Sequence, residues 1–312
     1  MSPEATAAPS VTAVVAHYGD PAVAQQAVSD LLGQAGSHLL EVVVVDDCSP
    51  VPFPELPEVV LVRRQENGGF GAAVNSGAAV ARGDLLMIVN SDVRLPAQLL
   101  DRLIPQAVPL MPAVVGPLTT TMSGAEEPTG RQFPTAGHWA IERLMLLQRY
   151  SHTPWYQRAT GRVRSSGRDP IRVDWLQGSL LMMPLADFLA VGGFDERFYL
   201  YSEEVDLQRR LSVAGLGAWL LPTIQIQHVG GASTDFDRSH EWLVRSRITY
   251  SEKWGGLTTL RGTMCAVAIA NFATRAAPRL VGRRTAPRVA WRREMKAVRM
   301  QPWPAGPGDR HV

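Results

Sequence analysis

The feature that most constrains the fold of this chain is an alternation of strand-like and helix-like segments in its N-terminal third. Alanine-rich segments at 21–34 and 70–82 have the spacing of helices. Between and around them lie short runs of β-branched and aliphatic residues, at 11–16, 39–46, 58–64 and 85–90. Strands that are apolar almost throughout and separated by helices are typical of a parallel sheet covered on both faces. The sequence therefore predicts an α/β doubly wound fold.

The size and N-terminus of the chain indicate a globular protein. With 312 residues, of which 46% are hydrophobic and 19% charged, the chain can bury a large core. Residues 1–10 carry no basic segment, and the apolar run after them is too short for a signal peptide or a membrane span. We therefore expect a flexible N-terminus on a cytoplasmic protein. Cys48 and Cys265 match no metal-binding spacing and are expected to be reduced thiols.

The C-terminal part of the chain differs sharply in charge from the rest. Residues 261–312 contain 11 Lys and Arg against 2 Asp and Glu, whereas residues 1–260 contain 20 against 27. Basic tails bind anionic lipid or nucleic acid, or only keep a protein soluble. Because the sequence offers no recognised nucleic-acid-binding module and residues 1–260 are net acidic, we expect no nucleic acid partner. An anionic membrane surface is the expected partner of the tail.

Details of this tail fit an interfacial position. Residues 258–273 are apolar enough to lie at a membrane interface but too short to span one. Trp291 and Trp303 are expected at the level of the lipid headgroups. The basic residues expected to face anionic lipid are Arg275, Arg279, Arg283, Arg284, Arg288, Arg292, Arg293, Lys296 and Arg299. Residues 258–312 are accordingly predicted to be a membrane-associating extension on the inner face of the cell membrane.

Acidic residues stand where two of the expected strands end. Asp46 and Asp47 end the strand in "VVVVDDCSP", and Asp92 follows the strand in "LLMIVNSD". In open α/β sheets, ligands bind outside the carboxyl ends of the strands. Carboxylates gathered there favour a divalent cation, which in turn suits a diphosphate. The alternative is that Asp47 and Ser49 only cap the next turn and that Asp92 only caps the helix that begins near Pro96.

A glycine-rich segment precedes the second expected helix. In "ENGGFGAAVNSG", glycines at 68, 69 and 71 allow the backbone to pass close to a ligand. A dinucleotide-binding fingerprint fits poorly, because Val74 stands where the third small residue belongs and the glycines do not follow the first strand. A sugar nucleotidyltransferase is also a poor match, since "VVAHYGDP" lacks a basic, glycine-rich loop after the first strand.

Taken in order, these segments resemble a known family, the inverting nucleotide-sugar glycosyltransferases of the GT-A fold, glycosyltransferase family 2. Within it the chain resembles the bacterial rhamnosyltransferase-like branch. The matching segments are "VVVVDDCSP", "NGGFGAAVNSG", the D-x-D-type element "NSD", "GGFDERFYLYSEEVDL" and "QHVGGAST", which together span roughly residues 11–234. The resemblance implies a GT-A domain at 11–257, with a nucleotide-binding half at 11–118 and an acceptor-binding half at 119–257.

The resemblance implies a set of nucleotide-binding residues. Asp47 matches the acid that accepts a hydrogen bond from the imide N–H of uracil or thymine, and the ring of Tyr18 is expected to cover that base. Asn90 stands where relatives carry the first acid of the D-x-D element, so its contact is through a neutral amide or water. The other residues expected on the nucleotide side are Asp46, Asn67, Gly69 and Asn75.

The resemblance also implies a metal site. Asp92, the last residue of the D-x-D-type element, matches a metal ligand, and His228 matches a histidine that contacts the metal or the diphosphate. The implied cofactor is a divalent cation, Mg²⁺ or Mn²⁺. The alternative for His228 is an ordinary histidine at a strand end.

The motif "SEEVDL" is implied to supply the catalytic base. In many relatives it reads Glu-Asp and the Asp deprotonates the acceptor hydroxyl; here the matching residue is Glu204, preceded by Glu203. With Asp206 these acids would otherwise form only the charged first turn of a helix. Trp175 and Gln177 are expected to form a sugar or acceptor platform, although a buried tryptophan is often only core. Residues 119–137 and 151–170 are polar segments containing Gly and Pro, which we expect to be loops and candidate lids. Arg131, on the first of them, is expected to pair with diphosphate oxygens unless it is merely exposed.

These implied roles describe one reaction. A metal-assisted single displacement moves a sugar, with dTDP-L-rhamnose as the first expected donor, to a glycan or polyprenyl-diphosphate-linked saccharide in cell-envelope polysaccharide synthesis. The alternatives are another sugar carried on UDP, or a non-catalytic relative that only binds carbohydrate or membrane. A homo-oligomer is a further expectation that the sequence leaves open.

Overall fold

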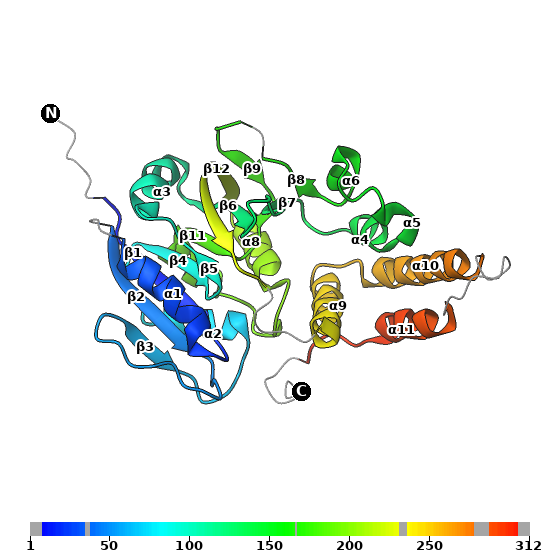
Figure 1. The fold of residues 1–312 in the computed structure, drawn as a ribbon, viewed down its shortest axis with the longest axis horizontal. Coiled ribbons are helices and arrows are strands. Elements are labelled where there is room, and N and C mark those ends of the chain that lie inside the picture. The colour runs from blue at the N-terminus through cyan, green and yellow to red at the C-terminus, as the bar shows by residue number, and fades with distance from the viewer. Residues whose placement is uncertain (1–7, 35–37, 166, 231–235, 278–286, 305–312) are drawn as a thin grey trace.

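A nine-stranded mixed sheet runs through the molecule (Figure 1). The computed structural model describes residues 8–34, 38–165, 167–230, 236–277 and 287–304. The strands of the sheet are β1 (Val11–His17), β2 (Leu39–Asp46), β3 (Val60–Arg63), β4 (Leu85–Asn90), β5 (Val93–Arg94), β6 (Ala113–Thr121), β9 (Ile171–Val173), β11 (Leu180–Pro184) and β12 (Gly217–His228). Their order is β3-β2-β1-β4-β11-β6-β12-β5, with β9 beside β12. Strands β1 to β4 pair in parallel, whereas β11 runs antiparallel to both of its neighbours.

Helices cover both faces of this sheet (Figure 1). On one face α1 and α3 pack over a core cluster that includes Ala13 and Val15, and on the other α2, α7 and α8 pack over Val14 and Ala16. This alternation follows from the two-residue period of a strand. The helices are α1 (Pro21–Leu32), α2 (Phe70–Ala78), α3 (Leu99–Ala107), a 3-10 turn at Val108–Leu110, α7 (Leu185–Ala190) and α8 (Glu203–Val213). The predicted α/β fold with a mostly parallel sheet is confirmed.

A smaller structure lies beside the C-terminal ends of the main strands. The segments 119–137 and 151–170, predicted as loops, contribute two strands of a three-stranded sheet with the order β10-β7-β8. The elements of this region are β7 (Gly130–Arg131), β8 (Arg162–Val163), β10 (Trp175–Leu176), α4 (Ala136–Arg143), α5 (Met145–Gln148) and α6 (Pro154–Ala159). Thr135 begins α4, because its side-chain oxygen accepts a hydrogen bond from the His138 amide at 3.1 Å.

The C-terminal helices pack onto this smaller structure. They are α9 (Phe236–Lys253), α10 (Leu257–Ala276) and α11 (Pro287–Arg299). Trp139 of α4 shares one hydrophobic cluster with Ile248 of α9, Met264 of α10 and Ala297 of α11. The cluster therefore crosses the predicted boundary between residues 257 and 258. None of the helices in the described part of the chain is sufficiently long and apolar to cross a lipid bilayer.

This packing occupies part of the tail. Leu260, Met264 and Val267 are at most 5% exposed and face the protein, whereas Ile269 is 59% exposed, so an interfacial position of 258–273 stays a prediction. Trp303 is also 5% exposed, and its indole N–H donates to the Ser246 hydroxyl at 2.9 Å, so it is not available to a headgroup region. Arg279, Arg283 and Arg284 lie outside the described residues.

Candidate active site

The two acids that end β2 are bonded inside the protein. Asp46 is buried, and its carboxylate accepts from the amides of Ser49 at 2.8 Å and Phe53 at 2.9 Å. Asp47 is equally buried and accepts from Arg64 Nε at 2.7 Å and from the amide of Gly69 at 2.8 Å. The carboxylate of Asp46 therefore holds the turn that follows β2. Binding of a nucleobase by Asp47 stays a prediction. A nucleobase N–H would have to share the carboxylate with Arg64 and Gly69.

Two other residues of the predicted nucleotide side have structural roles. Asn75 of α2 donates from Nδ2 to the Phe194 carbonyl at 2.9 Å and accepts from the Phe194 amide at 2.8 Å. Its amide therefore joins α2 to the loop before α8 instead of facing a ligand. Gly69 has a φ of +84°, and a Cβ there would collide with the Tyr199 carbonyl oxygen. The glycine is required by this close approach of two backbone segments.

Aromatic side chains mark the same end of the sheet. Tyr18 is 51% exposed just after β1, as a base-covering ring requires. Burial raises the pKa of Tyr199, and the nearby Asp47 and Tyr18 raise it further, so these three groups lie close together. Asn67 hydrogen-bonds to Tyr199 and also accepts from the Gly69 amide at 3.1 Å. The sequence analysis did not name Tyr199 beside Asp47 and Tyr18, because nothing in the sequence distinguishes it from an aromatic residue of the core.

Asp92 and His228 meet at the edge where β4 and β12 end and β5 begins. Pairing of β12 with β5 places His228 opposite Val93, and Asp92 Oδ2 lies 3.2 Å from His228 Nε2. The other ring nitrogen, Nδ1, lies 3.2 Å from Glu127 Oε2. Hydrogen bonds to Asp92 and then to Glu127 raise the pKa of His228 to about 10. Glu127 lies in a loop and was missed by the sequence reasoning.

The donor chemistry of this edge fits a divalent cation. A carboxylate and an imidazole at hydrogen-bond distance are ligands for Mn²⁺ or Mg²⁺, and Glu127 is placed to orient the imidazole from its far side. In the described part of the chain, no group of three or more His, Cys, Asp and Glu side chains forms a complete metal site. A cation held here would therefore take its remaining ligands from substrate oxygens or water. Asn90 ends β4 nearby, and its backbone N–H donates to the Ser179 carbonyl at 3.1 Å.

Glu203 and Glu204 are the first two residues of helix α8. Glu203 is 5% exposed, and burial raises its pKa well above the usual value, with Glu204 raising it further. Burial also raises the pKa of Glu204, although backbone N–H groups and Arg131 oppose the shift. The Oε2 atoms of both glutamates are buried without a hydrogen-bond partner among the described residues. A carboxylate in this state is a stronger base than an exposed one.

Asp206 has a different role from the one predicted. It is fully buried, and its carboxylate accepts from Arg210 at 2.9 Å, Lys253 at 2.9 Å and Trp254 at 2.8 Å. These partners fasten α8 to the end of α9. Asp206 is therefore occupied by contacts within the protein and does not line the cavity that Glu204 lines.

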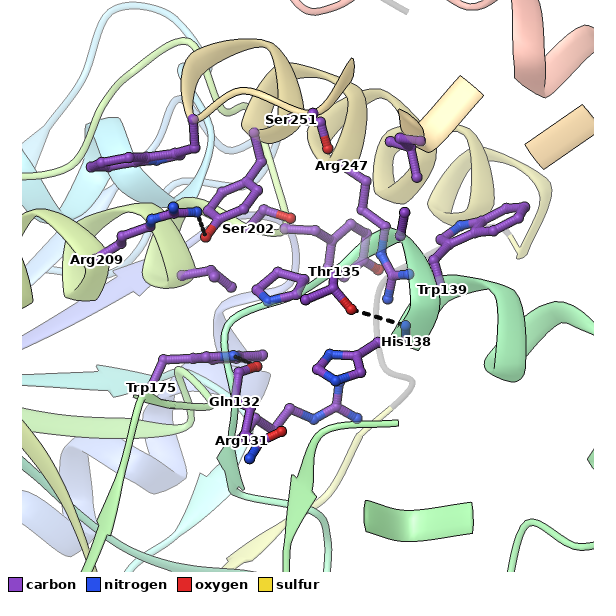
Figure 2. A pocket seen from close by; sticks show the side chains of 18 of the residues that line it. Arg131, Gln132, Thr135, His138, Trp139, Trp175, Ser202, Arg209, Arg247 and Ser251 are labelled. Carbon is purple, nitrogen blue, oxygen red and sulfur yellow. Dashed lines mark hydrogen bonds between the residues drawn. The ribbon is translucent and has the colours of Figure 1, made fainter. Parts of the chain in front are cut away.

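Glu204 lies in the wall of a cavity of about 490 Å³ between the small sheet and helices α4, α8, α9 and α10. Arg131, Trp175 and Gln177 line the same cavity, so four of the predicted acceptor-side residues are brought together. Figure 2 shows Trp175 and Arg131 on one wall of this cavity. Trp175 donates from Nε1 to the Gln132 carbonyl at 2.8 Å, and the Arg131 guanidinium lies 5.6 Å from its ring centre.

Other residues of the cavity were missed by the sequence reasoning. Most of them come from α4 and from α9 and the residue after it, whose placement beside Glu204 depends on long-range packing and leaves no local signal; Arg209 comes from α8. Figure 2 shows several of them around the cavity. They include His138, Trp139, Glu142, Arg209, Arg247, Tyr250 and Trp254.

Comparison with known proteins gives a consistent picture. Residues 12–160 match the model of the family described as "Glycosyl transferase family 2". Over 240 residues, 72% of this chain and 74% of the relative, the chain is 29% identical to the N-acetylglucosaminyl-diphospho-decaprenol L-rhamnosyltransferase of Mycobacterium tuberculosis H37Rv. It is 32% identical to the rhamnosyltransferase WbbL of Escherichia coli K12 over 80 residues, which is 25% of this chain and 30% of WbbL.

Two solved structures are similar in fold. A mannosyltransferase from Pyrobaculum calidifontis, in complex with GDP-Man and Mn²⁺, gives a TM-score of 0.54 at 16% identity, covering 94% of this chain and 86% of that one. GalNAc-T7 with UDP, GalNAc and Mn²⁺ gives 0.57 at 15% identity, covering 83% of this chain but only 55% of GalNAc-T7. At these identities the likeness shows the fold alone.

Proposed function

Because this chain belongs to glycosyltransferase family 2, in its rhamnosyltransferase branch, we propose that it transfers L-rhamnose from dTDP-L-rhamnose to a lipid-linked saccharide of the cell envelope. The donor sugar rests on the two similar rhamnosyltransferases, and the acceptor class on the M. tuberculosis relative, whose name specifies a diphospho-decaprenol. The chain is a glycosyltransferase enzyme, so the non-catalytic alternative is set aside.

The observation that carries this proposal is the position of Glu204. Its carboxylate lies in the wall of a cavity that also presents Arg131, Trp175 and Gln177, and burial raises its pKa. In the proposed reaction Glu204 accepts the proton of the acceptor hydroxyl as the hydroxyl oxygen bonds to the anomeric carbon. The bond from that carbon to the donor diphosphate breaks on the opposite face, so the configuration inverts. Trp175 supplies an apolar surface for a sugar ring.

At the strand ends, Asp92 and His228 would hold a divalent cation, and Glu127 would keep the imidazole oriented toward it. The cation, when bound, supplies positive charge to the diphosphate leaving group. These residues would place the ion at the edge of β4 and β12. Tyr18 is proposed to cover the nucleobase.

The proposal is tested by comparing donors with the full chain in Mn²⁺ buffer. The donors are dTDP-L-rhamnose, UDP-glucose, UDP-galactose and GDP-mannose, each with an N-acetylglucosamine diphospholipid, and released nucleoside diphosphate and glycosylated lipid are both measured. We expect kcat/KM for dTDP-L-rhamnose to exceed that for the others by roughly a hundredfold, the discrimination that binding pockets commonly achieve. Equal or faster transfer from a UDP-sugar would replace the rhamnose donor with that sugar.

A further inference from the structure

The cavity beside Glu204 contains an excess of fixed positive charge. Glu142 of α4 accepts from Arg247 of α9 at 3.0 Å and lies 4.0 Å from Arg131 of β7, so one carboxylate serves two guanidinium groups. All three side chains are between 16% and 20% exposed. They line the cavity itself. Figure 2 shows Arg131 and Arg247 reaching toward its centre from opposite sides, with His138 between them.

The titration behaviour of Arg131 agrees with this excess. Burial lowers the pKa of Arg131 to about 10, and the charges of Arg162 and Arg247 lower it further, whereas the carboxylates of Glu142 and Glu204 oppose the shift. Burial likewise lowers the pKa of His138; Glu142 opposes this shift, whereas Arg247 and Arg131 act in the same direction as burial. An anion placed between the two guanidinium groups would relieve the repulsion. Planar guanidinium groups that approach from two sides suit phosphate oxygens, to which they form charge-assisted hydrogen bonds.

A second cavity lies next to the first. Trp139 lines both the cavity at Glu204 and this second cavity, of about 340 Å³, between α4, α9, α10 and α11. Its lining is mixed: Met145, Val244, Met264 and Val267 are apolar, whereas Arg143, Arg275, Arg293 and Glu294 are charged. The chain therefore presents a base and cations in the first cavity and, past Trp139, a partly apolar space bordered by further arginines. A saccharide joined to a lipid through a diphosphate has its reacting hydroxyl, its negative charge and its hydrocarbon in the same order.

We propose that Arg131 and Arg247 bind the diphosphate of a lipid-linked acceptor, with the acceptor saccharide at Glu204 and the first part of the lipid beyond Trp139. This inference rests on the proposed acceptor class and adds the residues that recognise it. It is distinct from the predicted role of Arg131 toward the donor, whose diphosphate belongs with Asp92 and His228 at the strand ends. Glu142 acts as a positioning residue, because it holds both guanidinium groups from behind.

The first experiment measures binding without turnover. The probes are N-acetylglucosamine diphosphodecane and its diphosphate-free counterpart, decyl N-acetylglucosaminide, titrated into the full chain and followed by tryptophan fluorescence and calorimetry. We expect the wild type to bind the diphosphate probe at least tenfold more tightly. Arg131→Gln and Arg247→Gln should each weaken binding of the diphosphate probe by roughly tenfold to a hundredfold, the value of hydrogen bonds to a charged group. Binding of the diphosphate-free probe should change by less than about threefold.

The matched control is Arg158→Gln. Arg158 is an exposed arginine on α6, close in sequence to the cavity but outside its lining. This variant should bind both probes as the wild type does. Melting temperatures of all variants identify any that fail to fold, and Arg247→Lys provides a second, conservative test because it keeps the charge but loses the planar fork. Intermediate affinity in Arg247→Lys supports the proposal.

The second experiment separates this inference from the donor assignment. With whichever donor the enzyme uses, KM for the diphosphate acceptor should rise in Arg131→Gln and Arg247→Gln while KM for the donor stays within about threefold. If the wild type binds the diphosphate probe and the arginine variants do not, but dTDP-L-rhamnose gives no transfer, the acceptor site stands and the donor is wrong. If the variants bind both probes like the wild type, or lose donor binding instead, the acceptor site is overturned.

Discussion

The proposed role of Glu204 conflicts with its surroundings. As the proposed base it must be ionised in order to accept a proton, but the folded chain favours its protonated form. Its Oε2 atom is buried without a hydrogen-bond partner among the described residues, and burial raises its pKa. The same shift that strengthens the base makes its ionised form unfavourable in the folded state. Replacing the ionisable group should therefore affect activity and stability in opposite directions.

We expect Glu204→Gln to lower kcat by roughly 10²–10⁴-fold, the contribution of a positioned general base, with donor binding little changed. Glu203→Gln, in which the neighbouring carboxylate lies outside the cavity lining, should keep kcat within about tenfold of the wild type. Steady-state kinetics on both variants check this. The opposite pattern would assign the base to Glu203, since Asp206 is committed to Arg210, Lys253 and Trp254.

The stability of the same variant should depend on pH. A group with a raised pKa in the folded state contributes stability below its unfolded value, near 4.5 for Glu204, and loses it as pH rises through the folded value. Glu204→Gln should therefore melt close to the wild type at about pH 4 and above it at about pH 8. For the same reason, kcat/KM of the wild type should fall on acidification at a pH above 4.5. A melting-temperature difference that shrinks as pH rises would contradict this assignment.

His228 is held between Asp92 and Glu127. We expect loss of a proposed metal ligand, Asp92 or His228, to affect metal-dependent activity more than loss of Glu127, which orients the imidazole. Asp92→Asn and His228→Ala should abolish Mn²⁺-dependent transfer at metal concentrations that saturate the wild type. Glu127→Gln, which keeps a hydrogen bond to Nδ1 but loses the charge, should weaken the metal by roughly 10–100-fold. Activity titrations with Mn²⁺ after removal of metal with EDTA check these values.

The control for the metal variants is Glu126→Gln, because Glu126 is the adjacent acid and is exposed. It should titrate like the wild type. Wild-type kcat in Asp92→Asn or His228→Ala at saturating Mn²⁺ would remove that residue from the metal site.

At the scale of elements, helix α8 carries Glu204, the proposed base, and is fixed at its first turn by Asp206. The carboxylate of Asp206 is fully buried and joins Arg210 of α8 to Lys253 and Trp254 at the end of α9. Removing one member of a buried charge network leaves the other charges without their partner, at a cost of roughly 3–5 kcal/mol. The helix start is thus held by an interaction between helices and not only by the favourable position of acids at its N-terminus.

We expect Asp206→Asn to lower the free energy of unfolding by about 3 kcal/mol or more in urea titrations, because the amide keeps the shape but not the charge. Asp101→Asn is the matched control, since Asp101 is also an acid in the first turn of a helix, α3, but is exposed. The control should change stability by less than about 0.5 kcal/mol. A small effect in Asp206→Asn would show that Arg210 and Lys253 are satisfied without this carboxylate.

The elements differ in how well the sequence predicted them. The run Leu85–Asn90 was predicted as a buried strand because its apolar residues are continuous, and the structure places it between β1 and β11. Short strands such as β7 and β8, of two residues each, were predicted as loops. Their pairing with each other and with β10 is a tertiary effect that no local periodicity records.

The candidate site was predictable to the extent that its residues lie in ordered motifs. Glu204, Trp175 and Gln177 were named from their motifs and meet in one cavity. Arg247 and Trp139 were not, because they reach the cavity only through the packing of α9 and α4. Asn75 was assigned to the nucleotide because an amide within a glycine-rich segment has the same composition whether it faces a ligand or, as here, the Phe194 backbone.

At the scale of the whole molecule, the basic C-terminal helices α10 and α11 have two faces. One face contributes to the walls of the two cavities beside Trp139, and the other is a charged surface. Helix α11 exposes Arg288, Arg292 and Arg299, and it packs through Ala297 onto the cluster that surrounds Trp139. Deleting these helices would uncover that cluster, so a truncation cannot distinguish lost membrane binding from misfolding. Neutralising exposed charges leaves the cluster intact and is the cleaner change.

We propose that this surface docks the enzyme on an anionic membrane, where a lipid-linked acceptor resides. A triple variant, Arg288→Gln, Arg292→Gln and Arg299→Gln, should lose about 1 kcal/mol of membrane binding for each residue, or roughly a hundredfold in affinity. The matched control neutralises Arg158, Arg164 and Arg168, which are equally exposed but lie near α6 and β8. Co-sedimentation with vesicles containing phosphatidylglycerol measures both variants at low and high salt. Binding of the wild type should fall with salt, because screened charges attract the surface less. Equal loss in both triple variants would mean that net charge alone drives association, and undiminished binding of the α11 variant would exclude this helix as the docking surface.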